Sequence, residues 1–266
     1  MNREMLSYFN LSTHPFSKEI ATDDLLTLPS IQAALKTLEL LVETKGIGCL
    51  TGKSGTGKSC LIRMLMRGMH TGLVHPVYLC HTSIGVMEFY THLATALGLP
   101  PGGRRAALFR SIQERVYALH RTSRTHTVII VDEAHLLSNE ILKELRLLSN
   151  FEVDSVNAMT ILLCGQESLL QKFGLSILES LANSITISVS TTGLPKEETI
   201  SYVEQRITAC GGHAGLFTQG ALNLIHQASV GVLRSIGTIA TAGMGNAFIG
   251  NSPTVETEHI QSVISR

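Results

Sequence analysis

The chain has 266 residues, a formal net charge of +0 and a hydrophobic content of 44%, which suffices for one large or two modest domains with real cores. The balanced charge excludes a protein that attracts nucleic acid through its overall charge, and an aromatic content of 5% is low for stacking on single strands. The sequence shows no C-x-x-C pair, no apolar run of membrane-spanning length and no apolar segment of a secretory signal near its start. We therefore expect a cytoplasmic protein with reduced thiols and no membrane contact.

Strand and helix patterns alternate over the first two thirds of the chain. The leader, residues 1–20, has a turn locked by Pro15, and a helix is predicted from Pro29. Strands are predicted at 47–51, 74–80, 128–131, 160–164 and 185–189. Helices are predicted between them at 60–66, 86–97, 106–120, 140–148 and, broken near Gly174, at 167–182. Such alternation indicates an α/β fold with a parallel sheet covered by helices on both faces.

The last third of the chain changes character and carries helical patterns only, at 197–209, 219–227, 233–247 and from Thr257. We expect a boundary near 191–195. The predicted organisation is a leader at 1–28, an α/β domain at 29–192 and a small all-helical domain at 193–266.

The sequence GKSGTGKS fits the phosphate-loop pattern G-x-x-x-x-G-K-[ST] and lies between a predicted strand and a predicted helix. Glycines let backbone N–H groups approach phosphate oxygens, and the start of the following helix favours negative charge. Lys58 would neutralise the β and γ phosphates of a nucleoside triphosphate, and the Ser59 hydroxyl would bind Mg²⁺. A chance match in a glycine-rich turn is the alternative, which the flanking strand and helix disfavour. The predicted ATP-binding residues here are Gly52, Lys53, Ser54, Gly55, Thr56, Gly57, Lys58, Ser59 and Cys60.

Further along the chain, the sequence VIIVDEAH places two carboxylates after a run that is apolar at every position. A strand that is buried on both faces has this pattern, and ligands bind at the carboxyl ends of strands in open α/β sheets. Asp132 would hold Mg²⁺, directly or through water, and Glu133 would act as the general base on the attacking water. An ordinary strand with a solvated acidic turn is the alternative, and the upstream phosphate loop favours the catalytic interpretation.

Two further polar residues are candidates because of their positions. Gln166 follows the predicted strand 160–164, where it could sense the γ-phosphate or orient water; a simple loop amide is the alternative. Arg234 begins a helix of the last third, where it could fold over the nucleotide; a solvated arginine is the alternative. Gln166 completes the predicted catalytic set with Lys58 and Glu133, and Arg234 completes the ATP-binding set.

Arginines gather between the second and third predicted strands, at 104, 105, 110, 115, 121 and 124. Because arginine side chains bind phosphate backbones, Arg104, Arg105, Arg121 and Arg124 are the predicted contacts to duplex DNA. A solvated helix face explains the same residues equally well.

Taken in order, these motifs resemble those of the AAA+ ATPases, and within them the ExeA-like family, nearly from end to end. The segments that carry the resemblance are YFNLSTHPFSKEI, LTGKSGTGKS, VDEAHLLS, LKELRLLSNFE, LLCGQESLL, LPKEETISYVEQRI and SVGVLRSI. The resemblance implies a five-stranded AAA+ P-loop domain with a helical lid, binding of ATP and Mg²⁺, and roles for Gln166 and Arg234 as first and second sensors. It also implies that the leader, around Pro15 and Phe16, packs near the adenine.

The family has two main settings. General-secretion ATPases carry a membrane span and a periplasmic domain, which we do not expect here. Stand-alone ATPases of similar length are encoded by transposons and are similar in role to the TniB and TnsC regulators, which form rings or filaments on duplex DNA. The resemblance therefore implies a homo-oligomer whose partners are duplex DNA, a transposase and, as a further candidate, a target-selection protein. A soluble secretion-type ATPase and a nucleotide-gated interaction module with little turnover are the alternatives.

One departure from the family pattern concerns catalysis. Relatives commonly read Leu-x-Gln-Arg-Ile before the fifth strand, and this arginine suits a finger that reaches the γ-phosphate of a neighbouring subunit. The present chain reads LANSI, with Ser184 in that place. An arginine finger is worth about a thousandfold or more in rate in other systems. We therefore expect slow hydrolysis, a substitute such as Lys172 or Arg146 acting in trans, or a scaffold role in the ATP-bound state.

Overall fold

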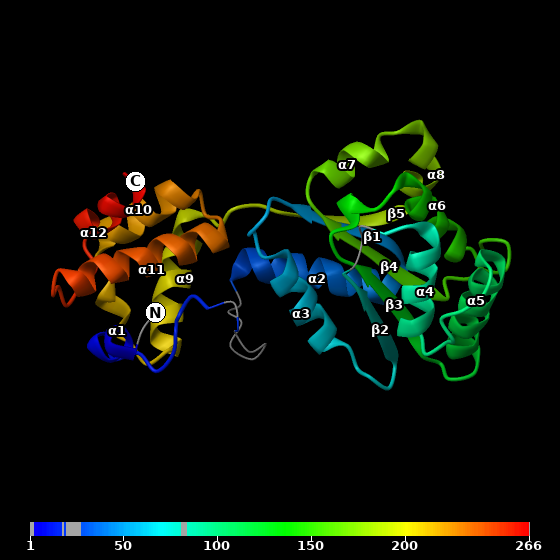
Figure 1. Cartoon of the computed structure of the whole chain (residues 1–266), viewed down its shortest axis with the longest axis horizontal. Helices are drawn as coiled ribbons and strands as arrows, with labels where there is room; N and C mark the ends of the chain where they lie inside the picture. Colours follow the sequence, from blue (N-terminus) through cyan, green and yellow to red (C-terminus); the bar gives the residue numbers. More distant parts are fainter. Residues whose placement is uncertain (1–2, 18, 20–27, 81–83, 266) are drawn as a thin grey trace. The chain divides into compact units, whose positions relative to one another are not determined.

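The structure is a computed structural model that describes residues 3–17, 19, 28–80 and 84–265. The chain forms two compact units (Figure 1). The α/β unit consists of Ala34–Ser54 and Leu61–Thr191. The helical unit consists of Met1–Ala33, Gly55–Cys60 and Thr192–Arg266. The short segment Gly55–Cys60, which belongs to the predicted phosphate loop and the helix after it, therefore groups with the helical unit.

A parallel five-stranded sheet forms the centre of the α/β unit, in the order β2-β3-β4-β1-β5. β4 lies between β3 and β1, so the carboxyl ends of these three strands lie side by side at one edge of the sheet. This confirms the predicted fold class. The strands are β1 (Gly46–Gly52), β2 (Val74–Leu79), β3 (His126–Val131), β4 (Met159–Gly165) and β5 (Ile185–Thr191).

One face of this sheet is covered by α4 (Val86–Ala96), α5 (Arg105–Arg121) and α6 (Asn139–Leu148) (Figure 1). Apolar residues of these helices form one buried cluster with Ile129 of β3 and Leu163 of β4, both of which are fully buried. Burial on this scale supplies most of the driving force for folding of the unit.

The opposite face of the sheet packs against α2 (Pro29–Thr44). Ile130 of β3 and Leu162 of β4 are fully buried but lie outside the first cluster, because successive side chains of a strand point to opposite faces. A Cβ atom at Gly48 would lie 2.4 Å from Leu41 Cδ2, so β1 and α2 approach closely at this glycine. Burial on both faces explains why the central strands are apolar at nearly every position.

The predicted elements agree with the structure to within two residues at their ends. The interruption expected near Gly174 is confirmed, because α7 ends just before this glycine. The remaining elements of residues 58–183 are α3 (Lys58–Gly68), η2 (Ala134–Leu136), α7 (Ser168–Phe173), η3 (Ser176–Leu178) and α8 (Glu179–Asn183).

The helices of the last third form the core of the helical unit, joined by a second buried cluster. These elements are α9 (Lys196–Ala209), η4 (Ala214–Leu216), α10 (Gln219–Ser229), α11 (Leu233–Ile249) and α12 (Thr257–Ile264). None of the described helices is both long and apolar enough to span a membrane.

The described part of the leader packs on these helices. It contains the short helix α1 (Arg3–Tyr8), which the sequence did not predict because six residues carry too little periodicity. The Ser12 N–H donates to the Cys210 carbonyl at 2.8 Å, and Arg206 Nε donates to the Pro15 carbonyl at 2.7 Å. The leader is therefore anchored to α9 and its C-terminal end, and its place near the adenine stays a prediction.

Candidate functional site

The residues after β1 form a tight loop that opens directly into α3. Gly55 and Gly57 have φ values of +85° and +102°, which residues with a Cβ atom rarely adopt. Lys58, the first residue of α3, is buried, and the first N–H groups of a helix have no partner within that helix. Main-chain donors, a lysine and a helix start thus come together in one short segment, an arrangement that fits an anion such as a phosphate.

The start of α11 contacts this loop within the helical unit. The Arg234 N–H donates to the Gly55 carbonyl at 3.2 Å. A Cβ atom at Gly55 would lie 2.7 Å from Arg234 Cβ, and one at Gly57 would lie 2.9 Å from Leu233 Cδ1. Glycine is therefore favoured at Gly55 for space as well as for φ, and at Gly57 mainly for φ, because the Leu233 side chain could move aside. The contact places Arg234 beside the predicted phosphate loop, and its role as a sensor stays a prediction.

β3 ends at a carboxylate whose two oxygens are both hydrogen-bonded. Asp132 is only 7% exposed; its Oδ1 accepts the Glu133 N–H at 2.9 Å, and its Oδ2 accepts the Tyr78 hydroxyl of β2 at 2.8 Å. Burial, together with the hydrogen bond to Asp132 and its charge, raises the pKa of Tyr78. The hydroxyl therefore keeps its proton at neutral pH and remains a donor, so Asp132 is held in one orientation at the carboxyl edge of the sheet.

The next acid, Glu133, leaves the strand in a different direction. Its φ of +53° lies in the left-handed region, where a non-glycine residue is strained. Its side chain is 50% exposed, and its Oε2 lies 3.3 Å from His135 Nδ1. The turn thus separates the two neighbouring acids into a fixed, buried carboxylate and a half-exposed one. A fixed carboxylate suits a metal ligand, and a half-exposed carboxylate can reach a water molecule as a general base must.

Gln166 follows β4, the strand next to β3, and its side chain is exposed. Its main-chain N–H donates to His135 Nδ1 at 3.4 Å. A Cβ atom at the preceding Gly165 would lie 3.1 Å from the His135 backbone nitrogen, so the end of β4 and the acidic turn pack closely. The structure therefore brings Glu133 and Gln166 together through His135.

Sequence reasoning did not single out Tyr78 or His135. His135 is visible in VIIVDEAH, but its contact with Gln166 depends on β4 being the neighbour of β3. Tyr78 is the second-last residue of its strand, and nothing local in VHPVYLC marks it as a partner of Asp132. The signal that could have found both residues is the strand order.

The four arginines predicted to bind DNA lie at the two ends of α5. Arg104 and Arg105 are at its N-terminus, and Arg121 and Arg124 are at or beyond its C-terminus, which is about 24 Å away at the usual helical rise. Arg105 contacts the buried carboxylate of Glu144 and lies 3.8 Å from Glu140. Arg121 lies over the Tyr117 ring, 5.4 Å from its centroid, and 3.9 Å from Glu152. The four side chains do not form one patch.

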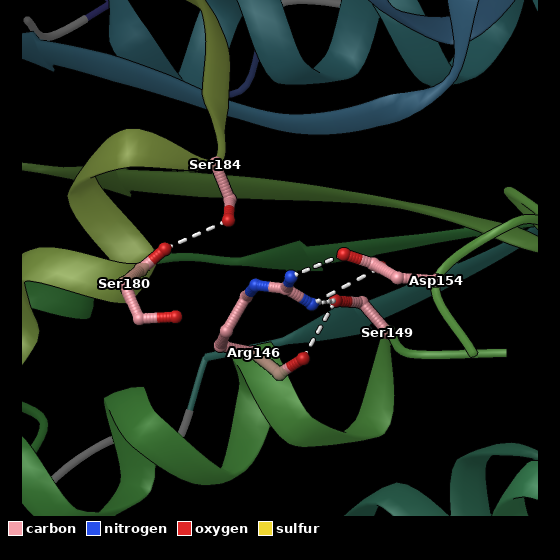
Figure 2. A network of polar contacts seen from close by, with 5 residues as sticks. All are labelled: Arg146, Ser149, Asp154, Ser180 and Ser184. Carbon is pink, nitrogen blue, oxygen red and sulfur yellow. Dashed lines mark hydrogen bonds and ion pairs between the residues drawn. The ribbon is translucent and has the colours of Figure 1, made fainter.

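Ser184 caps the C-terminus of α8, and its hydroxyl donates to the Ser180 carbonyl at 2.7 Å (Figure 2). Both basic residues considered as substitutes for a finger are engaged within their own chain. Arg146 donates to both carboxylate oxygens of Asp154, at 2.7 and 3.4 Å (Figure 2). Lys172 Nζ donates to the Leu137 carbonyl at 2.6 Å. Either side chain would have to leave these partners to act on another subunit.

These residues fit a nucleoside triphosphate with Mg²⁺. The loop offers main-chain donors and a lysine for phosphate oxygens. A hydroxyl such as that of Ser59 and a carboxylate such as that of Asp132 are each of the oxygen-ligand types that Mg²⁺ takes, few at a time, from proteins. A buried carboxylate held by two donors is already oriented for such a role.

Fold and site together define a P-loop nucleotide-binding protein. Residues 41–173 match the family model described as AAA domain, and the chain belongs to this family. The AAA fold implies nucleotide binding and hydrolysis, so the coarser part of the predicted function, an AAA+ ATPase, is confirmed.

Comparison with known proteins supports the ExeA-like class and shows the fold. The chain is 29% identical over 248 residues to General secretion pathway protein A of Aeromonas hydrophila. The match covers 92% of this chain and 45% of that protein. The chain thus spans less than half the length of this relative. The ORC2 protein of Aeropyrum pernix, solved as ADPNP-ADP complexes, has a TM-score of 0.69 at 14% identity, covering 96% of this chain and 72% of that one. The ORC1 protein of the same organism, solved in complex with DNA, has a TM-score of 0.67 at 18% identity, covering 91% and 66%.

Proposed function

We propose that the chain is a cytoplasmic, ATP-dependent AAA+ regulator of DNA transposition, which assembles as a ring or filament on duplex DNA and recruits a transposase. The observation that carries the nucleotide part is the phosphate loop after β1 together with the fixed Asp132 and half-exposed Glu133 after β3. The DNA part is supported by the similarity to an ORC1 protein solved in complex with DNA and by the motif resemblance to transposon-encoded ATPases.

Each residue of the site has a distinct task in this proposal. Main-chain N–H groups of the loop and Lys58 bind the β and γ phosphates, and Ser59 and Asp132 hold Mg²⁺, which neutralises phosphate charge when bound. Glu133 accepts a proton from the attacking water, which its half-exposed carboxylate can reach. Gln166, after β4, and Arg234, near the start of α11, are the proposed first and second sensors of the γ-phosphate.

In this proposal the binding of ATP, rather than its rapid hydrolysis, controls the activity of the protein. Ser184 offers no charge to a neighbouring active site, and Arg146 and Lys172 are engaged with Asp154 and the Leu137 carbonyl. Slow hydrolysis would leave the ATP-bound assembly on DNA long enough to recruit the transposase, and hydrolysis would then remove it from poor targets.

The test is the ATPase rate of the full chain with and without duplex DNA, together with electron microscopy on DNA with a slowly hydrolysed ATP analogue. We expect stimulation by DNA and ordered rings or filaments. Lys58→Ala should abolish nucleotide-dependent assembly, and Glu133→Gln should bind ATP but retain it unhydrolysed. The absence of both DNA stimulation and assembly would refute the DNA part of the proposal. Hydrolysis at the normal rate by Glu133→Gln would refute the assignment of Glu133 as the general base.

A secretion-type ATPase is the second candidate, and the similarity to General secretion pathway protein A favours it. A neighbouring gene for a DDE transposase would favour transposition, whereas neighbouring genes for secretion components would favour the alternative. Pull-down with a purified transposase, in the presence of ATP and DNA, separates the two biochemically. Binding that requires ATP and intact Lys58 is the result expected for a transposition regulator.

A further inference from the structure

A single ring nitrogen lies between the candidate general base and the candidate first sensor. His135 Nδ1 is 3.3 Å from Glu133 Oε2 and 3.4 Å from the Gln166 main-chain nitrogen. The His135 side chain is 10% exposed, so these neighbours, rather than bulk water, dominate the surroundings of its ring. Both distances are longer than a short hydrogen bond, so Nδ1 is close to both partners but tightly bound to neither.

The two contacts exclude each other for a chemical reason. An imidazole nitrogen carries either a lone pair or a proton in the ring plane. With the lone pair, Nδ1 accepts the Gln166 N–H and has nothing to donate to the Glu133 carboxylate. With the proton, Nδ1 donates to Glu133 and can no longer accept from Gln166. In a neutral ring the proton passes between Nδ1 and Nε2 through solvent, so the exchange changes no net charge.

The surrounding backbone makes this nitrogen sensitive to movement of β4. A Cβ atom at Gly165 would lie 3.1 Å from the His135 backbone nitrogen and 3.3 Å from Nδ1, so the strand end leaves no room for a side chain beside the ring. Glu133 is held in a left-handed conformation with a half-exposed side chain. A small shift of Gln166 therefore alters which partner Nδ1 binds, and the carboxylate of Glu133 can respond.

We propose that His135 is a positioning residue that couples Gln166 to Glu133, so that approach of the Gln166 N–H to Nδ1 releases the Glu133 carboxylate toward the attacking water. The proposal rests on the assignment of Glu133 as the base in the proposed function. Movement of Gln166 is thereby transmitted to Glu133 through His135 Nδ1. The exchange of partners does not change the net charge of a neutral ring.

The first experiment reads the ring directly and needs no turnover. Nitrogen-15 NMR of the histidine rings in the nucleotide-free full chain reports whether Nδ1 or Nε2 carries the proton. In the unsubstituted protein we expect a share of the Nδ1–H tautomer, which donates to Glu133. In Glu133→Ala, where the carboxylate is gone, we expect this share to disappear, so that Nδ1 accepts from Gln166. The His213 ring in the helical unit should not change. An unchanged His135 ring in Glu133→Ala would overturn the proposal.

The second experiment separates positioning from a merely structural role. His135→Phe keeps a ring but offers neither donor nor acceptor, so we expect kcat to fall about tenfold with KM for ATP unchanged. His135→Asn supplies an acceptor and a donor, and it should restore kcat to within about threefold. Equal kcat in His135→Phe and the unsubstituted protein, or no rescue by asparagine, would overturn the coupling. Failure of the unsubstituted protein to hydrolyse ATP would count against the proposed function instead, and the ring spectra would still test His135.

Discussion

The Tyr78 hydroxyl donates a hydrogen bond to Asp132 Oδ2 at 2.8 Å, across the pair of parallel strands β2 and β3. Because the Glu133 N–H occupies the other oxygen, the carboxylate has two donors and little freedom to rotate. Partners of this kind orient a metal-binding carboxylate before the metal arrives and are worth about ten- to a hundredfold in metal affinity in other proteins. Tyr78 is therefore an orienting partner of the proposed Mg²⁺ ligand.

Removal of this hydroxyl should weaken Mg²⁺ binding without weakening ATP binding. In Tyr78→Phe we expect the Mg²⁺ concentration for half-maximal hydrolysis to rise about tenfold, because Asp132 loses one of its two orienting donors. ATP affinity in the presence of a chelator should stay within about twofold, since the loop and Lys58 are untouched. A Mg²⁺ titration of the ATPase rate and a fluorescent-nucleotide binding assay measure the two quantities.

Tyr117→Phe is the matched control for this prediction. It removes a tyrosine hydroxyl from α5, where the partner is Glu152 rather than Asp132. It should leave the Mg²⁺ requirement unchanged. An equal change in both variants, or none in Tyr78→Phe, would remove Tyr78 from the site.

Local patterns were sufficient for the strands, the longer helices and the phosphate loop, because burial on both faces, helical periodicity and glycine spacing are visible in consecutive residues, whereas the six-residue α1 was missed. They were insufficient for Tyr78 and His135, whose partners lie on other strands. Those contacts depend on the order β2-β3-β4-β1-β5, which no single segment encodes. The left-handed φ of Glu133 was equally hidden, since glutamate gives no sign of it.

The arginines show a different limit of local patterns, because residues that lie close along the chain are here separated in space by the length of a helix. The helix α5 separates Arg104 and Arg105 from Arg121 and Arg124 by its full length. Arg105 is moreover the partner of Glu144, a carboxylate that is 6% exposed and also accepts the Tyr90 hydroxyl. Its position is better explained by this buried acid than by DNA.

Loss of Arg105 should therefore cost stability rather than DNA affinity. Arg105→Ala leaves the buried Glu144 without its cation, and we expect the free energy of unfolding to fall by about 2 kcal/mol, measured by urea denaturation. Arg104→Ala, one residue earlier and exposed, is the control and should leave stability unchanged within about 0.5 kcal/mol. If Arg105→Ala keeps its free energy of unfolding but loses DNA affinity, Arg105 contacts DNA.

An arginine at the position of Ser184 should accelerate hydrolysis in the assembled state. In Ser184→Arg we expect the DNA-stimulated ATPase rate to rise about tenfold or more, because a cation near a neighbour's γ-phosphate stabilises the transition state. The rate of dilute, unassembled protein should not change. Rates measured across a series of protein concentrations with and without DNA give both values.

Ser180→Arg is the control for charge alone, since it places the same cation one helical turn earlier on α8. Asp154→Asn tests the alternative substitute, because it removes the charged partner that holds Arg146. A rise in rate with Asp154→Asn, lost again when Arg146→Ala is added, would show that Arg146 acts in trans. A rise of equal size in Ser180→Arg and Ser184→Arg would exclude a specific finger position.

His126, the first residue of β3, should make the α/β unit sensitive to acid. Burial, with added repulsion from Lys45 and His120, lowers the pKa of His126 to about 4, and its Nε2 lies 2.8 Å from Thr160 Oγ1. Between about pH 6.5 and pH 4 the unfolded chain binds a proton that the folded chain does not. The free energy of unfolding therefore falls as the pH drops through this window, by an amount on the order of 3 kcal/mol.

His126→Gln retains a polar partner for Thr160 but cannot titrate, so the loss of stability between about pH 7.5 and pH 4.5 should shrink by most of that amount. Urea denaturation at the two pH values, followed by circular dichroism, measures the change. His70→Gln, which replaces an exposed histidine, should keep the full dependence. If His126→Gln and the unsubstituted protein lose the same stability on acidification, other groups cause the sensitivity. If His126→Gln alone loses less stability on acidification, the buried imidazole of His126 causes the acid sensitivity of the α/β unit.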